Sequence, residues 1–91
     1  MRDYEFRWTE WNRAKCERHG VDPDDAEYVV RNAARPFPMK IQNEKIVVWG
    51  QEPAGRYLQV IYLVDPDNRL FVIHAMPLTE SQRHQLRRRQ P

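Results

Sequence analysis

The sequence has 91 residues, with a hydrophobic fraction of 41% and a charged fraction of 31%, which is enough for one domain, residues 1–91, with a small core. No apolar run approaches the roughly 20 residues needed to cross a bilayer, and the charged start MRDYEFRW lacks the apolar stretch of a signal peptide. The single cysteine, Cys16, excludes an internal disulfide. We therefore expect a cytoplasmic protein in which Cys16 is a small residue on a helix face.

The N-terminal segment predicts an extended lead-in followed by a helix. Aromatic residues alternate with charged ones over residues 4–8, a period of two that is typical of a short strand or an extended segment. Thr9 can cap a helix that we predict from about Glu10 to Arg18, and Gly20 is a common residue just past a helix end. One face of this helix should carry three long side chains, those of Trp8, Trp11 and Lys15.

A second helix has the clearest start in the chain. Asp22 is a good N-cap and Pro23 suits the first helical position, while the acidic residues that follow suit the positive end of the helix dipole. Pro36 and Pro38 should end the helical region and force an extended path. The helix carries an apolar stripe that should face a core: Ala26, Val29, Val30 and Ala33.

Three β-branched and aromatic runs predict a sheet in the second half of the chain. They cover residues 45–49, 57–64 and 70–75. The loop 51–55 separates the first two, and the turn signature DPDN at 65–68 predicts a hairpin between the last two. Connections this short make neighbouring strands antiparallel.

The C-terminal segment predicts a basic helix. Thr79 and Gln82 have the spacing of a capping box. Against one acid, Glu80, this segment carries four arginines: Arg83, Arg87, Arg88 and Arg89. Such a helix can meet nucleic acid or an acidic partner, or it can be a solvated, frayed terminus, and we expect residues 90–91 to be disordered.

The elements combine into an α+β fold. We expect two N-terminal helices that cover one face of a three- to four-stranded antiparallel sheet, with a short C-terminal helix after the last strand. The sequence holds no zinc motif, P-loop, dinucleotide glycine motif or GxSxG elbow. We therefore expect neither a metal site nor a cofactor.

The remaining chemistry lies in cationic and hydroxyl side chains on or near the strands. The candidates for catalysis are Lys45, Arg56, Tyr62 and His74. Such groups can bind a phosphodiester, and a histidine can move a proton near neutral pH. Metal-free RNA cleavage needs only these parts, because the RNA supplies its own 2′-hydroxyl as nucleophile. The candidates for RNA binding are Lys40, Arg83, His84 and Arg87.

Each candidate also has a purely structural interpretation. His74 lies in an apolar strand and can be a half-buried histidine with satisfied hydrogen bonds. Arg56 can be a solvated charge at a strand edge, and Tyr62 can be an aromatic residue of the core or of a sheet face. The three tryptophans can stack on bases or pack in the core.

The order of four motifs resembles the BrnT family of toxin–antitoxin toxins. The residues that carry the resemblance are His19-Gly20-Val21, Glu27-Tyr28-Val29-Val30, Val48-Trp49-Gly50-Gln51 with Gly55-Arg56-Tyr57-Leu58, and Val72 to Glu80. The resemblance implies a RelE-like fold and a metal-independent endoribonuclease that inhibits translation. It also implies a DNA-binding antitoxin protein as partner, with RNA or the ribosome as target.

One position departs from that family. Its members usually carry arginine after the alanine that ends the last strand, and here Ala75 is followed by Met76. Methionine cannot bind phosphate or stabilise an anion. A toxin-like protein that binds a partner or nucleic acid without cleavage is therefore an alternative, and an orphan structural domain is a third.

Overall fold

The sheet of this α+β domain has four antiparallel strands in the order β1-β2-β3-β4, so each strand lies beside its neighbour in the sequence. The computed structural model describes residues 4–89. The strands are β1 (Met39–Lys40), β2 (Ile46–Gln51), β3 (Tyr57–Val64) and β4 (Leu70–Pro77). The α+β prediction is confirmed. Its fourth strand is β1, the two residues that follow the proline-rich segment and pair with β2.

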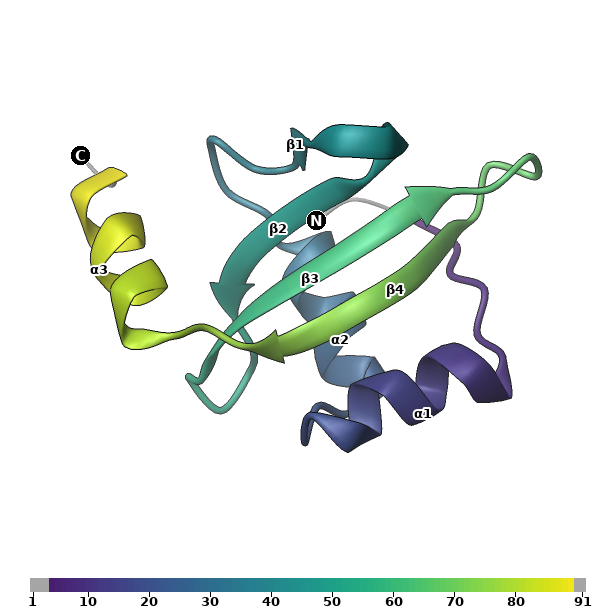
Figure 1. The fold of residues 1–91 in the computed structure, drawn as a ribbon, viewed down its shortest axis with the longest axis horizontal. Coiled ribbons are helices and arrows are strands. Elements are labelled where there is room, and N and C mark those ends of the chain that lie inside the picture. Colours follow the sequence, from purple (N-terminus) through teal and green to yellow (C-terminus); the bar gives the residue numbers. More distant parts are fainter. Residues whose placement is uncertain (1–3, 90–91) are drawn as a thin grey trace.

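Three α-helices flank the sheet at the predicted places. They are α1 (Glu10–Arg18), α2 (Pro23–Arg31) and α3 (Glu80–Arg89), and a short 3₁₀ turn, η1 (Gln42–Glu44), joins β1 to β2. Figure 1 shows α2 behind β2 and β3 and α1 along the β4 edge, while α3 stands beyond the end of the sheet. The predicted disorder of residues 90–91 lies outside the described part of the chain.

The predicted helix starts are confirmed by their caps. The Asp22 side chain accepts a hydrogen bond from the backbone of Asp24 at 2.8 Å. Thr79 and Gln82 form the expected reciprocal capping box, with bonds of 2.9 and 3.1 Å. Gly20 has a positive φ of 72° just past α1, a conformation that glycine adopts without strain.

The face of the sheet that α1 and α2 cover forms the core. The residues that fill it alternate along the strands and are almost completely buried, as in Val48, Leu58, Val60 and Val72. Cys16, which the sequence predicted as a small residue on a helix face, lies on α1 and in this core with no exposed surface. Gly50 lies against α2, where a Cβ would come within 3.4 Å of a methyl group of Val29.

The N-terminal segment is extended, as predicted, and is tied to both β4 and α2. Phe6 forms an isolated parallel bridge with Leu70 at the start of β4. The Trp8 indole nitrogen donates to Glu27 of α2 at 2.6 Å, and Arg31 donates to the same carboxylate at 3.2 Å. The prediction that Trp8 shares a face with Trp11 and Lys15 is wrong, because Trp8 precedes the helix and turns toward α2.

Candidate functional site

Within residues 4–89, no helix layer covers one face of the sheet, and the chemistry of this face differs from that of the core. In Figure 1 this face is turned toward the viewer, in front of α2. The strands carry only one fully charged side chain, that of Lys40, and no Asp or Glu. The uncovered face is therefore free of strand carboxylates that would repel an anionic ligand.

A β-bulge places His74 on this uncovered face. Ile73 has no partner on β3, because the register shifts by one residue between Ile61 and Tyr62. The extra residue turns the following side chains of β4 to the opposite face. His74 therefore lies opposite Ile61, whereas strict alternation from Val72 would have turned it toward the helices.

A stripe of side chains on α1 meets His74 at the β4 edge. Trp11, Lys15 and His19 follow one another at intervals of four residues, so they lie one above the other along the helix and its C-cap. Trp11 stacks on Phe71 of β4, with ring centroids 6.0 Å apart and planes inclined by 7°. The rings of His19 and His74 lie 5.5 Å apart.

An ion pair between Arg7 and Asp65 packs against the Phe71 ring of this stack. The guanidinium of Arg7 lies 4.1 Å from the Phe71 ring centroid, and its Nε donates to Asp65 at 2.9 Å. Asp65 also accepts hydrogen bonds from two backbone N–H groups of the β3–β4 turn. Trp11 thus has a fixed position while 53% of its surface stays exposed.

A hollow of about 350 Å³ lies between this stripe and the sheet. Two lysines line it. One is Lys45, just before β2, and the other is Lys15 of α1, whose Nζ lies 4.7 Å from the Trp11 ring centroid. Of the residues predicted to be catalytic, the structure brings His74 and Lys45 together here. The side chains that line the hollow are Trp11, Lys15, Lys45, Ile61, Ile73 and His74.

The surroundings of His74 favour its neutral form. Partial burial lowers the pKa of His74 below its ordinary value of 6.5, and the neighbouring His19 and Lys15 lower it further. A neutral imidazole at pH 7 can accept a proton. The two lysines add positive charge beside it, so the hollow combines a proton acceptor with groups that attract a phosphate.

No family model, curated protein or solved structure gives a significant match to this chain. The resemblance to BrnT toxins therefore stays a prediction from the sequence motifs. Within residues 4–89, no three His, Cys, Asp or Glu side chains come together to hold a metal ion. None of the helices in the described part of the chain is long and apolar enough to cross a membrane.

Two predicted catalytic residues lie outside the hollow. Tyr62 is only 2% exposed and faces the core with Leu58 and Val60, the position of the core aromatic residue that was its structural interpretation. Arg56 donates to the carbonyl oxygen of Gly20 at 3.0 Å and lies 3.9 Å from the buried Glu52. Arg56 thus links the start of β3 to the end of α1, and its catalytic role stays a prediction.

The predicted RNA-binding residues do not line the hollow either. Lys40 is exposed, but it alternates with Met39, which faces the uncovered side, and so points the other way. Arg83, His84 and Arg87 are exposed on α3, beyond the end of the sheet (Figure 1). Their contact with RNA stays a prediction.

Met76 does lie on the uncovered face, because it pairs with Gln59 two residues beyond His74. The arginine that the resemblance to BrnT toxins leads one to expect at this position would therefore share a face with the hollow. From the sequence, Trp11 was expected either to stack on bases or to pack in the core, and Lys15 and His19 were not placed beside His74. The four-residue spacing of Trp11, Lys15 and His19 can be read from the sequence, but only the fold shows that this side of α1 meets β4.

Proposed function

We propose that the chain is a metal-independent endoribonuclease that acts on the uncovered face of its sheet, as a toxin that inhibits translation. One observation carries the proposal: a neutral histidine, two lysines and an exposed tryptophan surround one hollow on a face without strand carboxylates. The alternation and the bulge bring residues of α1, β3 and β4 together with Lys45, which lies just before β2.

The residues of the hollow suit the chemistry of RNA cleavage. His74 accepts the proton of a ribose 2′-hydroxyl, whose oxygen attacks the adjacent phosphorus. The bond from phosphorus to the 5′-oxygen breaks, and that oxygen takes a proton from the ammonium group of Lys15 or Lys45. The lysines also stabilise the charge on the phosphate oxygens, and Trp11 offers a surface on which a base can stack.

The test is cleavage of a single-stranded RNA in the presence of EDTA. The wild-type protein should leave 2′,3′-cyclic phosphate ends, and its induced expression should stop bacterial growth. His74→Ala should lower the cleavage rate by about 10²- to 10⁴-fold, the usual contribution of a general base. Lys45→Ala should lower it by up to about 10²- to 10³-fold.

Lys40→Ala is the matched control for Lys45→Ala, because it removes a nearby lysine that points away from the uncovered face. It should cleave at the wild-type rate. A wild-type protein that neither slows growth nor cuts RNA would refute the proposal. Equal losses in the Lys40 and Lys45 variants would show that bulk charge, not the hollow, governs the activity.

The resemblance to BrnT toxins supports a partner and a location. We propose a small DNA-binding antitoxin protein that binds and silences this chain, and a cytoplasmic location where RNA and ribosomes are available. Co-expression with the product of an adjacent gene should restore growth and yield a complex that co-purifies. Unrelieved toxicity with every neighbouring gene product would contradict this partner.

Met76 favours a second candidate function, a toxin-like protein that binds without cleaving. It occupies the uncovered face where an arginine would serve as a further phosphate ligand. In that case the wild-type protein should bind RNA or a protein partner with no cleavage, and Met76→Arg should introduce cleavage. Cleavage by the wild-type protein would exclude this candidate.

A further inference from the structure

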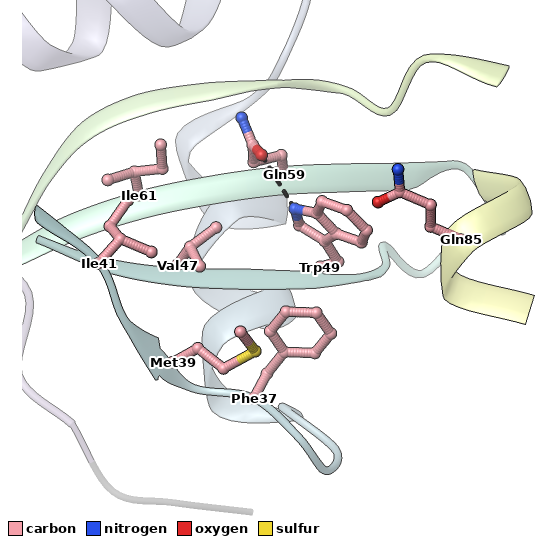
Figure 2. A pocket seen from close by; sticks show the side chains of 8 residues that line it. All are labelled: Phe37, Met39, Ile41, Val47, Trp49, Gln59, Ile61 and Gln85. Carbon is pink, nitrogen blue, oxygen red and sulfur yellow. Dashed lines mark hydrogen bonds between the residues drawn. The ribbon is translucent and has the colours of Figure 1, made fainter. Parts of the chain in front are cut away.

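A second hollow, of about 290 Å³, lies on the uncovered face beside the first. Figure 2 shows its apolar walls, with Trp49 and Phe37 on adjoining segments and Gln59 above them. The side chain of Ile61 lines both hollows, so the two adjoin at this residue of β3. The volume of the second hollow lies near the lower end of the range for small-molecule pockets, roughly 300–1,000 Å³, and it suits one flat ring system.

Gln59 gives this apolar hollow a directed polar group. The indole nitrogen of Trp49 can only donate, and it donates to the side-chain oxygen of Gln59 at 2.9 Å. The side-chain nitrogen of Gln82 donates to the same oxygen at 3.4 Å. The oxygen is thus occupied, and among the described residues the NH₂ group of Gln59 has no acceptor. It is free to donate to a ligand.

The hollow also lies between two sources of positive charge. The first hollow contributes Lys15 and Lys45 on one side. On the other side α3 contributes Gln85 to the rim of this hollow and carries exposed arginines. A ligand with an apolar ring and a flanking phosphate would match this arrangement better than a purely apolar side chain would.

We infer that this second hollow binds one base of single-stranded RNA, adjacent to the nucleotide whose phosphate occupies the first hollow. The base lies against the Phe37–Trp49 wall, and Gln59 donates to an acceptor on its edge. This inference rests on the proposed function and deepens it, because it names the part of the substrate that selects the cleavage position.

The test uses an eight-nucleotide 2′-O-methyl RNA, which cannot be cleaved because its 2′-oxygens are blocked, and a series in which each position in turn is abasic. Binding is followed by fluorescence anisotropy. Wild-type protein should lose affinity about fivefold or more at one position, the range expected when a stacked base is removed. Gln59→Ala should bind the intact RNA more weakly, and its abasic penalty at that position should shrink.

Gln51→Ala is the matched control, because Gln51 is a glutamine of β2 that lies outside this hollow and donates to the carbonyl oxygen of Gly55. It should keep the wild-type abasic profile. Gln85→Ala, on the exposed rim, is a second variant that leaves the core intact, and it should also weaken binding of the intact RNA. Circular dichroism spectra should show that each variant is folded.

Two results would overturn the inference alone. One is RNA binding with no abasic position that lowers affinity. The other is a concentration-dependent dimer that the Gln59 and Gln85 variants dissolve, because a second copy of the chain would then occupy the hollow. Absence of both RNA binding and RNA cleavage in the wild-type protein would overturn the proposed function together with this inference.

Discussion

Asn12→Ala should weaken the start of α1, the helix that carries one wall of the site. Asn12 has no exposed surface, and its side-chain oxygen accepts hydrogen bonds from the Thr9 backbone at 2.6 Å and from the Thr9 hydroxyl at 3.2 Å. Its side-chain nitrogen donates to the carbonyl oxygen of Arg7 at 3.1 Å. The substitution removes half of a capping box and leaves a part-buried carbonyl without its donor.

The magnitude follows from these two losses. A lost helix cap costs about 1 kcal/mol, and an unsatisfied buried polar group costs about 1–3 kcal/mol. The free energy of unfolding should therefore fall by about 2–4 kcal/mol. For a domain of this size, each 1 kcal/mol shifts Tm by roughly 4–8 °C, so Tm should fall by about 8 °C or more.

Urea and thermal unfolding followed by circular dichroism measure this change. Asn32→Ala is the matched control, since Asn32 is an exposed asparagine at the end of α2 whose side chain donates to a single carbonyl, that of Tyr28, at 2.8 Å. It should lower the free energy of unfolding by less than about 1 kcal/mol. Equal losses in the free energy of unfolding from the two substitutions would refute the claim that the Asn12 side chain stabilises the start of α1.

Three further predictions concern titratable groups. Lys15→Ala should raise the pKa of His74, because the lysine helps to lower it, and an unchanged or lower pKa in an NMR titration would contradict the hollow's geometry. Burial, with a smaller effect of Glu17, raises the pKa of Cys16 to about 11. The thiol should therefore react with a disulfide reagent only after urea unfolds the protein. Rapid reaction of the native protein would contradict this prediction. Hydrogen bonds from the Arg69 backbone, the Arg7 side chain and the Asp67 backbone hold the pKa of Asp65 below its ordinary value of 3.8. The stability that this carboxylate contributes is therefore complete above pH 3.8 and is lost as the pH falls through the lowered pKa. The Asp65→Asn variant should be less stable than the wild-type protein at neutral pH and should lose less stability on acidification. Identical acid unfolding curves of the two proteins would contradict this prediction.

Local signals predicted most of the fold. The caps at Thr9, Asp22 and Thr79 act within three residues of the chain, and each helix begins where its cap indicates. Asp65 closes the predicted hairpin through its own turn. Short-range geometry of this kind does not depend on the rest of the molecule, which is why the sequence suffices for it.

The site depended on longer-range geometry. β3 carries large apolar residues on both faces, so its sequence does not show that Tyr62 lies in the core and Ile61 on the uncovered side. The bulge at Ile73, which turns His74 outward, leaves no mark in an apolar strand. His74 and Lys45 were predicted as site residues, and Trp11 was one of three tryptophans predicted to stack on bases or to pack in the core. Its place in the same hollow as His74 became visible only once α1 was placed against β4.

The most direct test of the central claim is an NMR titration of the three indole N–H signals with non-cleavable 2′-O-methyl RNA. Trp11 and Trp49 line the two hollows of the uncovered face, whereas Trp8 donates to Glu27 on the helix side and serves as an internal control. RNA should shift the Trp11 and Trp49 signals and leave the Trp8 signal in place. A shift of the Trp8 signal alone, or no shift of any of the three, would contradict an RNA site on the uncovered face.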